Sequence, residues 1–211
     1  MGQNQVADIQ TVTKQMKADS YKMAALSLET RNTILRNVRE ALLQNQEEIF
    51  RANKKDMDAA EENGITEAVK KRLKFDGHKL ADVTQGIEEL IKLKDPIGKM
   101  QFKRQLDEGL TLQRITCPIG VIGIIFEARP DALVQISSLC IKSGNCAVLK
   151  GGKETTNTNR VLFRIIYQTA VESGAPMGCM YQAELHSEID ELLACHKSVD
   201  LLIPRGSNQF V

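Results

Sequence analysis

Tryptophan is absent from this 211-residue sequence, and phenylalanine and tyrosine bring the aromatic fraction to only 4%. A surface that stacks the bases of single-stranded nucleic acid needs aromatic rings, so this composition argues against one. Charge of either sign is also not in excess, because the formal net charge is +1. No block of Lys and Arg suggests a nucleic acid or a membrane surface. We therefore expect neither as a partner.

Long hydrophobic runs are missing as well. The longest uninterrupted apolar stretch is Val121–Phe126, with Gly123 inside it, and a membrane-spanning helix needs about 20 such residues. The first residues, Met1 to Gln15, are polar and show no signal-peptide core. The apolar fraction of 42% is that of an ordinary globular protein. We expect a cytoplasmic protein.

The sequence has no CxxC pair, and its three histidines show no metal-like spacing. An odd number of widely spaced cysteines argues against both a disulfide framework and a zinc site. No cysteine lies in a glycine-bearing turn after a strand, where a thiolate would be activated. We predict that all five are small core residues and that the chain holds no metal. They are Cys117, Cys140, Cys146, Cys179 and Cys195.

The first half of the chain is charged and has helical periodicity. Apolar residues recur at helical spacing over 21–53, which predicts a pair of helices broken near Ser27–Thr30. A further helix is predicted over 53–63, with Gly64 as its C-cap, and another restarts at Thr66. The next runs from about His78 to Leu93 and ends before Asp95-Pro96. Solvated faces of helices that cover a core are the plain interpretation of these charges.

The second half alternates short apolar runs with helical patterns. After an alternating stretch over 110–116, strands are predicted over 120–126, 147–149, 180–185 and 199–203. Helices are predicted over 131–142, 155–172 and 188–194. This alternation predicts right-handed βαβ units and a parallel sheet with helices on both faces, an α/β fold. Ligands of such sheets bind beyond the carboxyl ends of the strands. Three turns at those ends are therefore candidate sites.

The first turn is Glu127–Asp131, directly after a buried strand. Glu127 and Arg129 are candidate substrate-binding residues, because a planar guanidinium matches two oxygens of a carboxylate or phosphate. The alternative is a Glu–Arg or Arg–Asp pair that only orders the turn and caps the next helix.

The second turn is Lys150–Glu154, with Gly151, Gly152 and Lys153 inside it, immediately before a helix. Two glycines admit close approach of a ligand, and the lysines and the helix N-terminus favour an anion. The turn is neither a Walker A loop nor a GxGxxG fingerprint. A surface turn with solvated lysines is the alternative interpretation.

The third turn is Pro204–Gln209 and contains Arg205, Gly206 and Ser207. Its backbone N–H groups could hold a diphosphate, and simple capping of the next helix by Ser207 is the alternative. Each turn by itself is a weak indication of a ligand site, and three of them at one edge of one sheet are a stronger one.

At these turns the sequence resembles the γ-glutamyl phosphate reductase family, a branch of the aldehyde dehydrogenase superfamily. The resemblance rests on PIGVIGIIFEARP at 118–130, on CIKSGN at 140–145 with AVLKGGKE at 147–154, and on VDLLIPRGSN at 199–208. It covers the chain from about Ala18 onward. It implies an aldehyde-dehydrogenase-like, Rossmann-type parallel sheet preceded by helices.

The resemblance also implies an activity: NADPH-dependent reduction of L-glutamyl 5-phosphate to L-glutamate 5-semialdehyde and phosphate, in proline biosynthesis. Lys150, Gly151, Gly152 and Lys153 would then bind the adenosine end of NADP(H), and Gly206 and Ser207 its diphosphate. Residues 1–110 would form an N-terminal helical region with the start of an oligomerisation hairpin, and 111–211 an incomplete cofactor-binding domain. Full-length family members are expected to be homo-oligomers.

The family's nucleophilic cysteine would lie beyond Val211, in a catalytic domain that we expect to be absent here. A truncated reductase, inactive alone, is then the leading interpretation. The alternative is a non-catalytic nucleotide-binding or interaction subunit derived from this family. The reading frame after codon 211 would distinguish the two.

Overall fold

The structure is a computed structural model, and it describes residues 8–184 and 187–206. Its elements follow one another as helices first and alternating strands and helices afterwards. The helices are α1 (Ile9–Ala25), α2 (Leu28–Gln44), α3 (Gln46–Glu62), α4 (Glu67–Leu73), α5 (Gly77–Lys92), α6 (Pro130–Lys142), η1 (Lys153–Thr155), α7 (Thr156–Glu172), η2 (Met177–Cys179) and α8 (Ser187–Leu193). The strands are β1 (Met100–Asp107), β2 (Leu110–Ile115), β3 (Val121–Phe126), β4 (Cys146–Lys150), β5 (Met180–Ala183) and β6 (Leu201–Arg205).

The predicted parallel sheet is present. Its strand order is β5-β4-β3-β6, and every neighbouring pair is parallel. β3 and β4 are buried at every position, as expected for central strands that helices cover on both faces. The predicted end of the last strand at Ile203 is wrong, because Pro204 and Arg205 belong to β6 and pair with β3. β6 pairs on that side only, and proline is tolerated in such strands.

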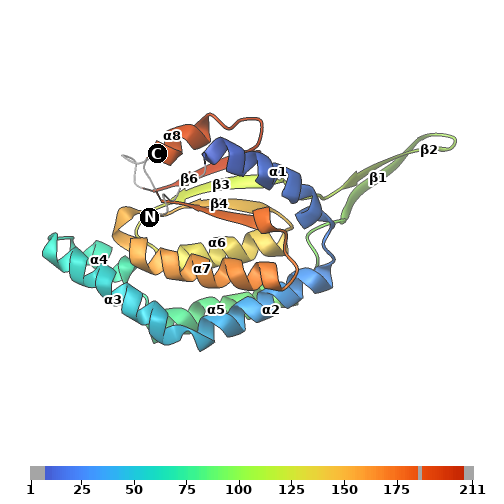
Figure 1. The fold of residues 1–211 in the computed structure, drawn as a ribbon. Helices are drawn as coiled ribbons and strands as arrows, with labels where there is room; N and C mark the ends of the chain where they lie inside the picture. The colour runs from blue at the N-terminus through green and yellow to red at the C-terminus, as the bar shows by residue number, and fades with distance from the viewer. Residues whose placement is uncertain (1–7, 185–186, 207–211) are drawn as a thin grey trace.

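The molecule is layered (Figure 1). α1 and α8 cover one face of the sheet, and α6 and α7 cover the other. A further layer, formed by α2, α3 and α5, packs against α6 and α7. One continuous core joins these layers, with Met16 of α1, Ile34 of α2, Val148 of β4 and Leu162 of α7 among its members.

Capping residues explain where several helices begin. The Ser27 hydroxyl accepts the Thr30 N–H at 3.0 Å, which places the break between α1 and α2 where the sequence predicted it. The prediction of a separate helix over 53–63 is wrong, because α3 runs unbroken from Gln46. The break lies at Asn45, whose side chain donates to the Ala41 carbonyl and closes α2.

Buried polar side chains of α3 hold the neighbouring helices α4, α5 and α7 in place. Asp56 accepts the backbone N–H of Asn157 at 3.1 Å and that of Thr158 at 2.7 Å, so it caps α7. Asn53 donates to the Leu73 carbonyl and accepts the Phe75 N–H. These bonds hold the end of α4, the segment before α5 and the start of α7 against α3.

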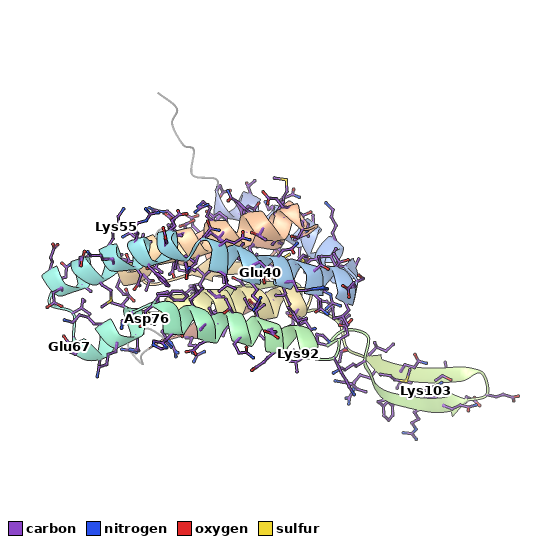
Figure 2. The ribbon with its side chains drawn as sticks, turned by 90° about the horizontal axis from the view of Figure 1, so that it is seen from below. Glu40, Lys55, Glu67, Asp76, Lys92 and Lys103 are labelled. Carbon is purple, nitrogen blue, oxygen red and sulfur yellow. The ribbon has the colours of Figure 1, made fainter. Side chains whose placement is uncertain are left out.

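The hairpin of β1 and β2 projects from the body, as Figure 1 and Figure 2 both show. All residues of both strands are exposed. Figure 2 also shows the charged outer surface of the helical layer, with Glu40, Lys55 and Lys92 labelled. Among the described residues, no helix has both the length and the apolar character needed to cross a bilayer.

Candidate functional site

The ends of three parallel strands bring the three candidate turns to one edge of the sheet. In the ladder, Ile125 of β3 lies beside Lys150 of β4, and Phe126 lies beside Arg205 of β6. The residues that follow these positions therefore emerge side by side at the carboxyl edge. This is where open parallel sheets bind their ligands.

A cleft of about 550 Å³ opens at this edge. It lies where the turn after β3, the turn after β4, the end of β6 and helix α4 come together. Three guanidinium groups and two carboxylates line it, so positive charge is in excess. The lining residues are Val69, Arg72, Phe126, Glu127, Ala128, Arg129, Ala132, Gln135, Glu154, Arg205 and Gly206.

The turn after β3 has an unusual backbone. Ala128 has a φ of +38°, in the left-handed region that L-residues rarely adopt, and it is buried. Its N–H donates to Glu154 Oε1 at 2.7 Å. Arg129 is extended and Pro130 takes the first position of α6, where a proline suits the start of a helix. The chain thus turns sharply and presents Glu127 and Arg129 to the cleft.

The guanidinium of Arg129 is paired with a carboxylate on one side and remains partly exposed. Its Nη2 lies 3.2 Å from Asp131 Oδ2, and the Asp131 side chain is only 5% exposed. Lys79 of α5 approaches the same carboxylate at 3.5 Å. The Arg–Asp pair considered as an alternative therefore exists. The Arg129 side chain nevertheless stays 44% exposed and lines the cleft, so it can still meet an anion.

The turn after β4 divides its two lysines. Lys150 is buried and its Nζ donates to the Gly151 carbonyl at 2.9 Å, whereas Lys153 is exposed. Burial lowers the pKa of the Lys150 ammonium, and Glu188 and Glu154 oppose that shift. The alternative of solvated lysines is thus wrong for Lys150, and the exposure of Lys153 fits either interpretation of the turn.

A second, much smaller cavity of about 20 Å³ lies beside this turn. Lys150, Gly151, Gly152 and Asn159 are among its lining residues. Asn159 is 1% exposed and its Oδ1 has no hydrogen-bond partner in the described part of the chain. Such a volume admits about one water molecule. The Asn159 Oδ1 can therefore accept a hydrogen bond from one small donor in this cavity.

The structure does not bring all predicted site residues into one cavity. Glu127, Arg129 and Gly206 share the large cleft, whereas Lys150, Gly151 and Gly152 line the small cavity. Lys153 is exposed on the same turn. Ser207 lies outside the described residues.

Three charged residues of the cleft were not among the predicted site residues. Arg205 and Glu154 flank the glycines that drew attention, so their turns carried a signal. Arg72 had none, because it lies on α4 and nothing in its neighbourhood marks a ligand. Only the packing of α4 beside the turn after β3 places it at the cleft.

Four of the five cysteines are buried, as predicted, and Cys117 is not. The prediction for Cys117 is wrong because the residue lies in the connection between β2 and β3, outside the sheet. Burial raises the pKa of Cys140 to about 12 and that of Cys179 to about 12. Such thiols stay protonated near neutral pH and are poor nucleophiles. In the described part of the chain, no three His, Cys, Asp or Glu side chains gather as a metal site would require.

Comparison with known proteins agrees with this architecture. A γ-glutamyl phosphate reductase of Acetivibrio thermocellus is 49% identical over 93% of this chain. A solved γ-glutamyl phosphate reductase of Saccharomyces cerevisiae superposes over 95% of this chain with a TM-score of 0.90 and 38% identity. That of Thermotoga maritima superposes over 96% with a TM-score of 0.92 and 28% identity.

The chain spans about half the length of these relatives: 46% of the first, 51% of the second and 50% of the third. Over residues 1–211 it matches the family described as the aldehyde dehydrogenase family. The parallel sheet, the cleft at its carboxyl edge and this match agree, and the chain belongs to the aldehyde dehydrogenase family.

Proposed function

We propose that this chain is the cofactor-binding part of a γ-glutamyl phosphate reductase. The reaction is the reduction of L-glutamyl 5-phosphate by NADPH to L-glutamate 5-semialdehyde and phosphate, in proline biosynthesis. The observation that carries the proposal is the cleft at the carboxyl edge of the sheet, where three guanidiniums outnumber two carboxylates. Two relatives named γ-glutamyl phosphate reductase, 49% and 38% identical to this chain, support the proposal.

The substrate carries a phosphate and a carboxylate, and the cleft offers matching cations. We assign Arg129 to one of these anionic groups, because its guanidinium is fixed by Asp131 and still exposed. Glu127 lines the same cleft and would face the substrate's ammonium group. Arg72 and Arg205 add the charge that a second anionic group requires.

The dinucleotide fits the turn after β4 and the end of β6. A water molecule in the small cavity would link the unpartnered Asn159 Oδ1 to a ribose hydroxyl beside Lys150, Gly151 and Gly152. The exposed Lys153 favours the phosphorylated form of the cofactor. Gly206, with Ser207 after it, would lie beside the diphosphate. When bound, the cofactor supplies the hydride.

We propose that this chain binds the ligands but does not catalyse the reaction by itself. Cys140 and Cys179 are buried with raised pKa values, and none of the five cysteines lines the large cleft. The division into a helical region, 1–110, and a cofactor-binding region, 111–211, remains a proposal about function. A cytoplasmic location is proposed on the five unpaired thiols.

Titration calorimetry with NADPH on the 211-residue chain tests the cofactor assignment. The double variant Lys150→Ala/Lys153→Ala should bind NADPH at least tenfold more weakly, because it loses two cations of the turn. The matched control is Lys54→Ala/Lys55→Ala, which removes two exposed lysines of α3 and should leave the affinity unchanged. No NADPH binding by the wild-type chain would refute the assignment.

Inorganic phosphate, the reaction's product, probes the substrate side. Arg129→Ala should weaken phosphate binding about tenfold while NADPH affinity is kept. Arg51→Ala, an exposed arginine of α3, is the control. Lost NADPH affinity with normal phosphate binding would count against the assignment of Arg129.

The hairpin supports a second candidate role, in association. All residues of β1 and β2 are exposed, including Phe102, Leu106 and Leu112. A two-stranded hairpin is marginally stable when nothing covers it, so we propose that it packs against a further copy in a homo-oligomer. A non-catalytic interaction subunit would use the same surface.

A further inference from the structure

Glu154 joins the turn after β4 to the turn after β3. It lies in η1, next to Lys153, and its Oε1 accepts the Ala128 N–H at 2.7 Å across 26 residues of sequence. The first of these turns holds the cofactor candidates and the second holds Glu127 and Arg129. One carboxylate therefore connects the two halves of the site.

Ala128 is the residue that most needs such a contact. It is the non-glycine residue with a positive φ in the described chain, and this region is unfavourable for alanine. Strained backbone of this kind persists only where its surroundings hold it. Its methyl group packs in a small cluster with Ala60 and Leu73, and its N–H is held by Glu154.

Gly152 leaves the space that Glu154 occupies. Its φ of −67° is ordinary for any residue, so backbone freedom does not explain the glycine. A Cβ at this position would instead overlap the Glu154 carboxylate. Because that carboxylate ends a flexible side chain, an alanine at 152 would be accommodated by moving Glu154 away from Ala128.

We propose that Glu154 is a positioning residue that couples the cofactor-side turn to the substrate-side turn, by holding the Ala128 bend that presents Glu127 and Arg129. The predicted coupling between the two ligands rests on the function proposed above, whereas the role of Glu154 in holding the bend does not. A ligand that orders either turn then orders the other through this bond. Linkage requires the effect to be reciprocal, so NADPH and phosphate should strengthen each other's binding.

Hydrogen exchange of the Ala128 amide tests the contact without any ligand. In the chain labelled with ¹⁵N-alanine, Glu154→Ala should speed this exchange at least tenfold, and Glu154→Gln, which keeps an acceptor oxygen, should restore slow exchange. Gly152→Ala should behave like Glu154→Ala. Glu62→Ala, at an exposed glutamate of α3, is the control. An unchanged Ala128 rate in Glu154→Ala and Gly152→Ala overturns the inference.

Calorimetry of phosphate binding with and without saturating NADPH tests the coupling. We expect about fivefold tighter phosphate binding with NADPH in the wild-type chain. The effect should shrink to within twofold in Glu154→Ala and persist in Glu154→Gln, a pattern that a merely structural role would not produce. Equal coupling in wild type and Glu154→Ala overturns the inference. A chain that binds neither ligand refutes the proposed function instead, and the Ala128 exchange rates then decide by themselves whether Glu154 holds the bend.

Discussion

Gly120, immediately before β3, shows how one residue admits a contact between distant parts of the chain. Its φ is +124°, and a Cβ there would overlap the Asp200 carboxylate. Asp200 accepts the Val121 N–H at 2.8 Å and pairs with Lys17 of α1 at 2.6 Å. The glycine thus lets the start of β3, the start of β6 and α1 meet.

Gly120→Ala should lower the free energy of unfolding by about 2 kcal/mol, because it combines an unfavourable φ with displacement of Asp200. Urea unfolding followed by circular dichroism measures this. Gly86→Ala is the matched control, because Gly86 lies inside α5 with nothing within 4 Å of its added Cβ. That variant should be more stable by roughly 0.5–1 kcal/mol. Equal effects of the two substitutions would contradict the argument.

Among whole elements, α5 depends on a charged cap. Asp76 accepts the Lys79 N–H at 3.1 Å and pairs with Lys74 at 2.9 Å, and Figure 2 shows it at the start of α5. The Lys74 ammonium, with the Lys79 N–H, lowers the pKa of Asp76 from 3.8 to about 2. The folded chain therefore favours the ionised form.

This lowered pKa makes stability depend on pH in one window. The contribution is fully present above the unfolded pKa near 4 and is lost as the pH falls toward about 2. Solvent screening at this 34% exposed side chain limits it to at most about 1 kcal/mol. Asp76→Asn keeps a capping oxygen but does not titrate, so its unfolding free energy should fall less between pH 4 and 2. High salt should reduce the difference between the two proteins. If the unfolding free energies of wild type and Asp76→Asn fell in parallel between pH 4 and 2, the prediction would be contradicted.

The β1–β2 hairpin is the element through which we propose that copies of the chain associate. Ladder pairs Phe102↔Arg114 and Arg104↔Leu112 place Phe102 and Leu112 on one face. Phe102→Lys/Leu112→Lys should lower the mass measured by sedimentation velocity to that of the monomer. Tyr21→Lys, an exposed aromatic residue of α1, should not. A wild-type chain that is monomeric at every concentration would refute the association.

At the scale of the whole molecule, buried thiols report on global unfolding. Cys140, Cys146, Cys179 and Cys195 are buried and Cys117 is exposed. A thiol reagent should label one cysteine rapidly in the native chain and the other four only as the protein opens. Cys117→Ser should abolish the rapid phase and leave the slow one. More than one rapid thiol would mean that the core is looser than described.

The sequence determined the sheet and the place of its turns. Short β-branched runs between amphipathic helices admit one common solution, parallel strands joined by right-handed crossovers, and this aligns the ends of β3, β4 and β6. Predicted strands over 120–126 and 147–149 accordingly lie within one residue of β3 and β4. These features depend on local periodicity, which the sequence carries in full.

Tertiary structure alone decided what each turn contacts. Packing between distant elements places Arg72 of α4 at the cleft and brings the Ala128 N–H to Glu154. It also forms the separate cavity at Lys150 and leaves Cys117 exposed. No spacing along the chain encodes them, because they depend on the angles and distances between helices and strands far apart in sequence. Periodicity specifies which face of an element is buried, but only packing specifies against what.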